Sequence, residues 1–202
     1  MAKVNSVRKI KFSKPITISS KKIKFSSIHS KARKSSNGAK FIVSACLIGK
    51  NCFYDGSSRK DENIKTLLDN GLAVAVCPEQ LGALSTPRPP SEIFAGDGDD
   101  VLKGKAFIFN KEGKEVTANF IKGAKEFLAI VKENNIKTAI LKSNSPSCGK
   151  GNIYDGNFNN NLRKGNGVTA ALLLKNNIEV MTEQEFSISK YAKKINEKKT
   201  RR

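Results

Sequence analysis

Histidine is nearly absent from this sequence. Its single histidine, His29, lies in an N-terminal segment whose composition differs from that of the rest of the chain. The remaining sequence therefore cannot contain a Ser-His-Asp triad, a Cys-His catalytic pair or a histidine-ligated zinc site.

Long apolar runs are also lacking. No segment approaches the ~20 apolar residues that a membrane-spanning helix needs, and nothing near Met1 resembles the apolar core of a secretory signal. We therefore expect a soluble cytoplasmic protein with reduced thiols and no membrane partner. In that setting, cysteines bind metals or act in catalysis more often than they pair as disulfides.

Acidic residues are missing from the first 40 positions, which hold 12 lysines and arginines. Residues 190–202 hold 7 basic residues against one glutamate, so most of the net charge of +19 lies in two tails. The 149 residues between them carry 18 basic and 17 acidic residues and are nearly neutral. We therefore divide the chain into a basic Lys/Ser-rich tail (1–40), one catalytic domain (41–189) and a basic C-terminal tail (190–202).

The tails are too charged and too poor in apolar residues to form a core, which predicts disorder. Two functional interpretations of residues 1–40 stay open. A basic arm could contact the phosphates of a nucleic acid. A basic, acid-free segment could also be a transit peptide, which would place the protein in an organellar matrix.

The domain alternates strand-like and helix-like segments. Short apolar runs predict strands at 41–45, 72–76, 105–109, 137–142 and 178–181. Helical spacing of apolar residues predicts helices at 61–70, 117–131 and 167–174, with Thr117 as a helix cap. This alternation predicts an α/β fold, a Rossmann-like single domain with a mainly parallel sheet flanked by helices.

Three of the four cysteines lie at or just beyond strand ends. These are Cys46, Cys77 and Cys148, and the carboxyl edge of a parallel sheet is where such folds bind ligands. Converging thiolates suit zinc or an iron–sulfur cluster. With Cys52 as a fourth ligand the site would be all-thiolate and closed. Without it, three thiolates on a four-iron cluster leave one iron open to a substrate.

Polar residues adjoin these cysteines. The loop 143–149 is rich in hydroxyl groups, which either shape the turn or face a ligand beside Cys148. Glu79 lies two residues from Cys77 and is either a solvated carboxylate or an acid/base group. Arg88, in a proline-rich loop, either binds a carbonyl or anion or pairs with Glu92. The Tyr-Asp-Gly turn at 54–56 could place Tyr54 or Asp55 at the pocket.

Four segments together resemble the successive motifs of one family. They are VSACLIGKNCFYDG (43–56), CPEQLGALSTPRPPSEI (77–93), ILKSNSPSCGKGNIYDGNF (140–158) and GNGVTAALLLKNNIEV (165–180). The chain resembles, over residues 41–184, the short iron–sulfur proteins long described as a domain of unknown function, whose characterised members are 2-thiouracil desulfurases. It departs from the family pattern at Ala83, where a glycine is usual.

The resemblance implies a [4Fe-4S] cluster held by Cys46, Cys77 and Cys148, with Glu79 and Ser145 in catalysis. The family varies at Cys52, which implies that Cys52 is not a ligand. The implied reaction is desulfuration of a thiolated pyrimidine to its oxo-base with release of sulfide. A cluster enzyme also implies the iron–sulfur assembly machinery as a partner.

Two other functions stay open. The enzyme could desulfurate thiolated bases in RNA, with the basic tails binding phosphates in a salt-dependent way. Alternatively, four cysteines could bind zinc in a nucleic-acid-binding module.

Overall fold

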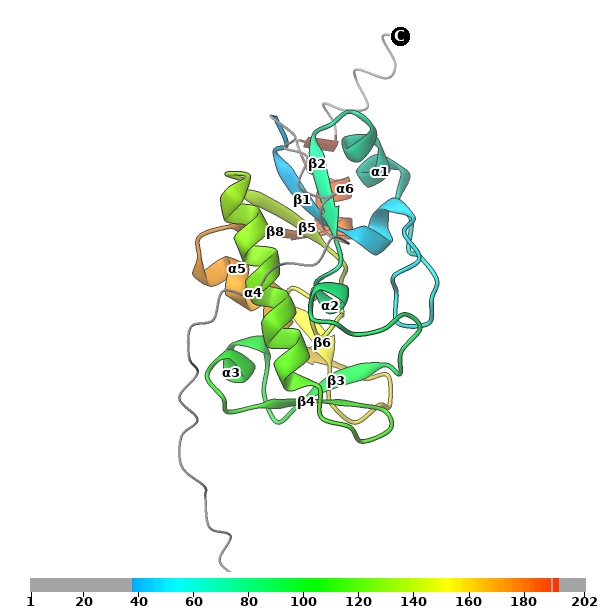
Figure 1. The fold of residues 1–202 in the computed structure, drawn as a ribbon, viewed down its shortest axis with the longest axis vertical. Coiled ribbons are helices and arrows are strands. Elements are labelled where there is room, and N and C mark those ends of the chain that lie inside the picture. The colour runs from blue at the N-terminus through cyan, green and yellow to red at the C-terminus, as the bar shows by residue number, and fades with distance from the viewer. Residues whose placement is uncertain (1–37, 190, 193–202) are drawn as a thin grey trace, which may run out of the picture. The chain divides into compact units, whose positions relative to one another are not determined.

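The computed structural model describes residues 38–189 and 191–192 (Figure 1). The predicted disorder of residues 1–37 and of most of the C-terminal tail lies outside these residues. In the part that is described, no helix is long and apolar enough to cross a membrane.

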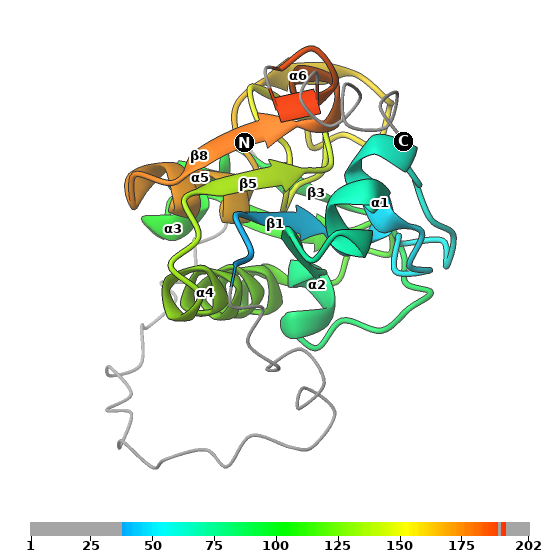
Figure 2. The same cartoon turned by 90° about the horizontal axis from the view of Figure 1, so that it is seen from above.

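A four-stranded parallel sheet forms the centre of the domain, as the alternating pattern predicted. Its strands, in spatial order, are β2 (Ala73–Val76), β1 (Phe41–Ser44), β5 (Thr138–Leu141) and β8 (Glu179–Thr182). The arrows of β1, β5 and β8 run in the same direction in Figure 2. β1 is buried along its whole length, and its first three residues are apolar without alternation, as is typical of a parallel strand covered on both faces.

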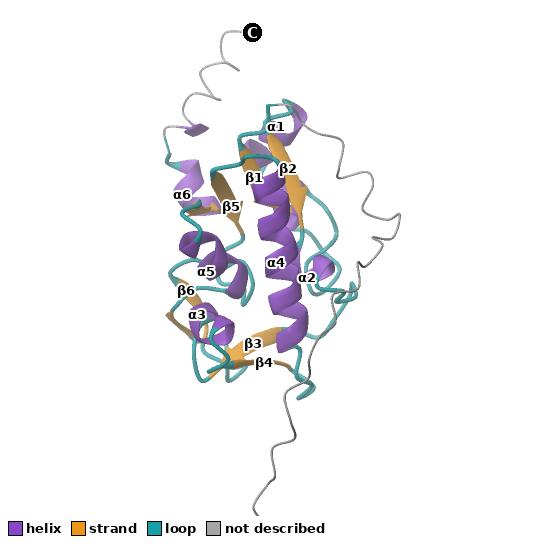
Figure 3. Ribbon diagram, turned by 60° about the vertical axis from the view of Figure 1, so that its left-hand side comes forward, coloured by secondary structure: helices purple, strands orange, loops and turns teal. Residues whose placement is uncertain are grey.

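Helices cover the two faces of this sheet. The helices α1 (Glu62–Asp69) and α6 (Glu183–Ser187) pack on the face to which Phe41 and Val43 point. The helices α4 (Thr117–Glu133) and α5 (Val168–Lys175) pack on the other face, around Ile42. The helices α4 and α5 lie next to one another in Figure 3.

The longest helix, α4, forms because its buried residues recur at helical spacing. Phe120, Ala124, Phe127 and Val131 all face the core. The prediction that Thr117 caps the helix was wrong, because Val116 precedes the first turn and no side chain caps it. The Thr117 hydroxyl instead accepts a hydrogen bond from the Ile108 N–H at 2.9 Å, and so ties α4 to a neighbouring strand.

The short helix α2 (Pro78–Leu81) follows β2 and contacts α4 main chain to main chain. A Cβ at Gly123 would lie 2.0 Å from the Pro78 carbonyl oxygen, and a Cβ at Gly82 would lie 2.1 Å from the Asn119 carbonyl oxygen. Only glycine permits this approach. The Asn119 side-chain amide also donates to the Gly82 carbonyl at 2.8 Å, so one side-chain hydrogen bond adds to the close backbone contact between α2 and α4.

Two small antiparallel sheets were not predicted. One pairs β3 (Ser91–Phe94) with β4 (Phe107–Asn110), and the other pairs β6 (Asn152–Tyr154) with β7 (Leu162–Lys164). The apolar run at 105–109 therefore forms a strand, but in a separate sheet. The short helix α3 (Gly98–Leu102), whose N-terminus is capped by Asp97, lies between β3 and β4 along the chain.

The C-terminal end of the fold extends beyond the boundary proposed at residue 189. The Tyr191 ring packs edge-on against Phe41, with ring centroids 5.2 Å apart. Ala192 is buried in the same cluster. The folded part of the described chain therefore reaches at least residue 192.

Candidate functional site

The ends of three parallel strands bring all four cysteines together. Cys46 lies in the 3₁₀ helix η2 (Ala45–Ile48) directly after β1, and Cys77 precedes α2 at the end of β2. Cys148 lies in the loop after β5. These residues and Cys52 line one small cavity of about 30 Å³, called here the inner cavity. The predicted convergence of three strand-end cysteines is what the structure shows, and Cys52 lies with them.

Three of the four thiols, those of Cys52, Cys77 and Cys148, have pKa values raised by this environment. A hydrogen bond with Cys46 is the main cause that raises the pKa of Cys52 to about 12. A hydrogen bond with Cys52, together with burial, raises the pKa of Cys77. Burial raises the pKa of Cys148 to about 12. A metal that binds here must therefore displace protons from the thiols.

The four cysteines around the inner cavity supply the all-sulfur donor set that an iron–sulfur group takes. Within the described residues, no three His, Cys, Asp or Glu side chains are placed to hold one metal ion. Cluster thiolates bind separate iron atoms, so they surround the group rather than meet at one point. Sulfur-only ligands are typical of such clusters. The inner cavity is smaller than a cluster, so the thiol side chains must rotate apart to hold one.

Ser44 is a functional candidate that the sequence analysis missed. It is buried at the end of β1, and its hydroxyl donates to the Cys148 sulfur at 3.3 Å. The same oxygen accepts the Lys142 N–H at 3.0 Å. A donor to the sulfur lowers the pKa of Cys148, against the effect of burial. The available signal was a hydroxyl residue inside an otherwise apolar strand.

Ser145 shapes the loop that carries Cys148. Its hydroxyl oxygen accepts the N–H groups of Ser147 and Cys148, each at 3.1 Å. This is the turn role that the sequence left open, and Ser145 also lines the inner cavity. The loop is held from behind by Gly167, where a Cβ would lie 2.5 Å from the Ser147 carbonyl.

Glu79 forms an ion pair with Arg88. The Arg88 Nε donates to Glu79 Oε2 at 2.8 Å, and the two side chains are 6% and 16% exposed for Arg88 and Glu79. Arg88 also donates to the carbonyls of Ser85 and Cys52, each at 3.0 Å. The suggested pairing of Arg88 with Glu92 was therefore wrong, and Arg88 instead orients the carboxylate of Glu79.

Glu92 has a different role. Its Oε2 accepts the N–H groups of Gly156 at 2.9 Å and Phe158 at 3.1 Å. This buried carboxylate ties the loop after β6 to β3. Phe158 has a φ of +55°, in the left-handed region, so the loop turns sharply at the point where Glu92 holds it.

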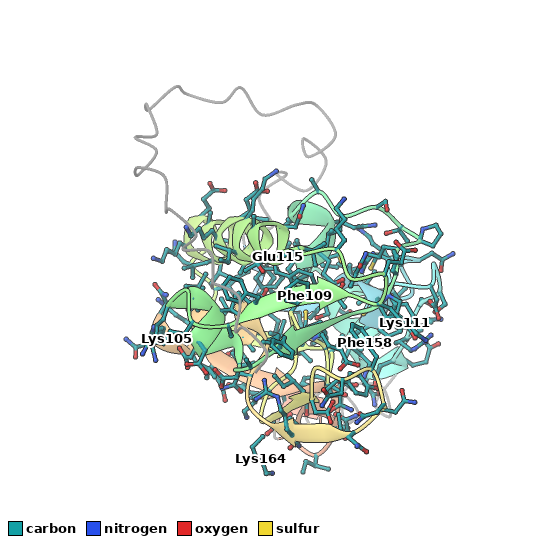
Figure 4. All side chains as sticks on the ribbon, turned by 90° about the horizontal axis from the view of Figure 1, so that it is seen from below. Lys105, Phe109, Lys111, Glu115, Phe158 and Lys164 are labelled. Carbon is teal, nitrogen blue, oxygen red and sulfur yellow. The ribbon has the colours of Figure 1, made fainter. Side chains whose placement is uncertain are left out.

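A larger cavity of about 460 Å³, called here the outer cavity, adjoins the inner one. Four residues line both: Phe53, Glu79, Lys142 and Ser145. Lys111 and Phe158, both labelled in Figure 4, line the outer cavity and not the inner one. The boundary residues are thus where a ligand in the outer cavity meets the cysteines.

The two residues of the Tyr-Asp-Gly turn are placed differently. Tyr54 lines the outer cavity, whereas Asp55 is not among its lining residues. The Asp55 carboxylate instead accepts the Ser57 N–H at 2.8 Å and pairs with Arg59 at 3.3 Å. Asp55 therefore stabilises the turn.

Lys142 belongs to a partly buried polar network at the boundary. Its ammonium pairs with Glu183 and donates to the Ser143 hydroxyl at 2.8 Å. The second Glu183 oxygen accepts the Ser143 N–H at 2.9 Å. Burial acts to raise the pKa of Glu183, but the hydrogen bonds from Lys142 and Ser143 outweigh it, and the pKa lies below its usual value.

Comparison with known proteins gives three consistent matches. A family model described as 2-thiouracil desulfurase matches residues 41–185. The uncharacterized protein YbbK of Bacillus subtilis (strain 168) is 48% identical over 146 residues, which cover 72% of this chain and 97% of that protein. The solved structure of the [4Fe-4S]-dependent thiouracil desulfidase TudS (DUF523Vcz) is 38% identical with a TM-score of 0.66, covering 78% of this chain and 98% of that one.

Proposed function

Because the chain belongs to the 2-thiouracil desulfurase family, we propose that it hydrolyses the C–S bond of a thiolated pyrimidine to give the oxo-base and sulfide. The observation that carries this proposal is the boundary between the two cavities. There a carboxylate and a hydroxyl, Glu79 and Ser145, line both the cysteine-lined inner cavity and the larger outer cavity.

We propose that Cys46, Cys77 and Cys148 hold a [4Fe-4S] cluster, a proposal supported by the similarity to a [4Fe-4S]-dependent desulfidase. When bound, the cluster supplies an open iron that attracts the soft thiocarbonyl sulfur and acts as a Lewis acid. Cys52 is outside this ligand set, and its thiol contacts the ligand thiols of Cys46 and Cys77. Loading the cluster implies the iron–sulfur assembly machinery as a partner.

Glu79 is the proposed acid/base group. Arg88 holds its Oε2 in place, and no hydrogen bond among the described residues engages Oε1. This leaves Oε1 to accept a proton from the water that adds at the thiocarbonyl carbon. The oxo-base then forms as the C–S bond breaks, with no change of oxidation state and no nicotinamide or flavin.

Ser145 and Phe53 position the base. The acceptor capacity of the Ser145 oxygen is used by two backbone N–H groups, so its own O–H is free to donate to the ring or the water. Phe53 lies beside Tyr54, with ring centroids 4.7 Å apart, and the Arg59 guanidinium covers one face of its ring at 4.1 Å, which leaves the other face and the ring edge for a pyrimidine.

Anaerobic purification or reconstitution, followed by a turnover assay, tests the function. We expect about four irons and matching labile sulfide per chain, and conversion of 2-thiouracil to uracil and sulfide. Stoichiometric zinc without labile sulfide would contradict the proposal, as would a loaded enzyme that releases no sulfide from any thiolated pyrimidine.

An RNA-bound thiolated base is the second candidate substrate, favoured by the 12 basic and no acidic residues of positions 1–40. Comparing the full chain with one lacking residues 1–37, on thiolated RNA and on free thiobase, separates the two. An RNA substrate predicts a loss on RNA alone, steeply dependent on salt. A zinc-binding nucleic-acid module predicts zinc and no turnover. The cytoplasmic location stays a prediction.

A further inference from the structure

Lys142 is the one cation among the described residues that line both cavities. It directly follows β5, on the strand-end edge that carries the cysteines. Its three companions at the boundary are an aromatic ring, a carboxylate and a hydroxyl. Arg88 lines only the inner cavity, and Arg59 and Lys111 line only the outer one. Lys142 therefore stands where the ligand and the cysteines meet.

The Lys142 ammonium is held firmly but is not fully used. It has three N–H donors, of which one pairs with Glu183 and one reaches the Ser143 hydroxyl at 2.8 Å. The Ser143 carbonyl, at 3.5 Å, is at the limit of hydrogen-bond distance. Since the Lys142 and Glu183 side chains are only 19% and 13% exposed, the ammonium has a fixed position with spare donor capacity.

The other nearby cation cannot serve in the same way. Every nitrogen of the Arg88 guanidinium donates to protein, with partners that include Glu79 and the carbonyls of Ser85 and Cys52. Its charge orients Glu79 and is not directed to a ligand. Of the two cations that line the inner cavity, Lys142 is therefore the one with donor capacity left for a ligand.

The proposed reaction develops a negative charge at the boundary. When the water oxygen bonds to the thiocarbonyl carbon, its proton passes to Glu79 and the C=S π electrons move onto sulfur. The C–S bond then breaks, the oxygen stays as the new carbonyl, and sulfur leaves as sulfide with the protons of water. Fixed charges in a water-poor site stabilise developing charge strongly.

We propose that Lys142 is a further catalytic residue of this reaction, whose ammonium contacts the departing sulfur and stabilises its negative charge. This inference rests on the proposed desulfurase function and assigns it an electrostatic group. The alternative is a purely structural role for Lys142. In that role its ammonium would only position the Glu183 carboxylate, which in turn accepts the Ser143 N–H.

Four variants of the full-length, cluster-loaded enzyme separate these roles. Lys142→Met removes the charge, and Lys142→Arg keeps it. Glu183→Gln leaves the Lys142 charge while breaking its ion pair. Lys150→Met is the matched control, because Lys150 pairs with Glu185 at 2.8 Å in the same region but lines neither cavity. Turnover and the affinity for inorganic sulfide, followed by the cluster spectrum, are measured at equal iron content.

We expect Lys142→Met to lower kcat by ~10²–10³ with little change in KM, and to weaken sulfide binding by about tenfold or more. Lys142→Arg should recover part of both losses, Glu183→Gln should lose less than about tenfold, and Lys150→Met should match the wild type. Wild-type sulfide affinity in Lys142→Met, or an equal loss in Glu183→Gln, would overturn the proposal.

Two further outcomes are decided by the same measurements. If Lys142→Met does not fold, Lys142→Gln removes the charge in its place: a loss of sulfide affinity larger than that of Glu183→Gln supports the proposal, and wild-type sulfide affinity overturns it. Absence of thiobase turnover in the wild type would contradict the proposed function, while the sulfide affinities would still measure the contact with Lys142.

Discussion

The inner and outer cavities adjoin, yet they are built differently. The inner cavity is formed by the ends of parallel strands, with cysteines and buried ion-paired residues around it. The outer cavity is lined largely by loops and by strands of the two antiparallel sheets, and its lining is mostly polar and aromatic. The outer cavity, which has the larger volume, is thus the one lined by the less regular backbone.

From this difference we expect the inner cavity to carry the reaction and the outer cavity to select the substrate. Buried strand ends cannot shift without disturbing the core, so they suit groups that must keep a fixed geometry. Loops on a rigid scaffold tolerate change and commonly carry specificity. We therefore expect substitutions around the inner cavity to abolish the reaction, and those around the outer cavity to change which substrate is accepted.

Replacing the cysteines should give the largest effect and tests the inner cavity directly. Cys46→Ala, Cys77→Ala and Cys148→Ala should each lose the cluster, because each removes one of three proposed ligands. Cys52→Ala, in the same cavity, should keep it. Iron and labile sulfide per chain after anaerobic reconstitution measure this. Cluster loss in the Cys52 variant would mean four-thiolate ligation and a closed metal site.

Two carboxylates allow a matched comparison of the cavities. Glu79→Gln keeps the acceptor for Arg88 but cannot take a proton, so turnover should fall by ~10²–10⁴ with the cluster spectrum unchanged. Glu92→Gln keeps an oxygen for the Gly156 and Phe158 N–H groups and should cost less than about tenfold. Similar losses in both variants would show that the two cavities do not divide the work in this way.

Replacing Ser145 should have a smaller effect, because the substitution removes both a proposed substrate contact and two hydrogen bonds of the loop. Ser145→Ala leaves the N–H groups of Ser147 and Cys148 without their acceptor, which costs roughly 1–3 kcal/mol. Ser145→Thr retains the hydroxyl and should retain most turnover. Rates at matched cluster occupancy, together with urea unfolding, distinguish a lost substrate contact from a distorted loop. Wild-type turnover in the alanine variant would remove Ser145 from the mechanism.

The smallest effect concerns Ala83, which follows α2 and lines neither cavity. Its φ is +65°, in the left-handed region that glycine adopts without strain. A left-handed alanine costs about 1–2 kcal/mol, partly offset by the greater unfolded-state entropy of glycine. Ala83→Gly should therefore stabilise the fold by about 0–1 kcal/mol in urea unfolding. A clear loss of stability would show that the methyl group packs usefully.

The inner cavity was largely readable from the sequence because its signals are local. Apolar runs that end at Cys46 and Cys77, and one followed by the polar loop that carries Cys148, mark the strand ends, and parallel pairing brings those ends together. The exceptions, Ser44 and the Glu79–Arg88 pair, depend on contacts between separate strands and loops. A hydroxyl residue in an apolar strand indicates that the hydroxyl has a buried hydrogen-bond partner, but the sequence does not identify that partner.

The outer cavity could not be derived in the same way. Its strands β3, β6 and β7 mix polar with apolar residues, so no apolar run marks them, whereas apolar runs mark the equally short strands of the central sheet. The loop after β6 is shaped by Glu92, more than sixty positions earlier in the chain. A contact between positions so far apart in the chain leaves no recognisable sequence pattern in either segment.

The contact of α2 with α4 has a consequence for how such a protein can diverge. Glu79 is carried by α2, whose carbonyl at Pro78 occupies the space that a side chain at Gly123 would need. Substitutions of neighbouring side chains during evolution should leave the Glu79 carboxylate in place, because the backbone contact between α2 and α4 sets the position of α2. Mutational sensitivity should then be high at Gly82 and Gly123, two positions with no functional group, and a map of tolerated substitutions would show α4 as part of the active site.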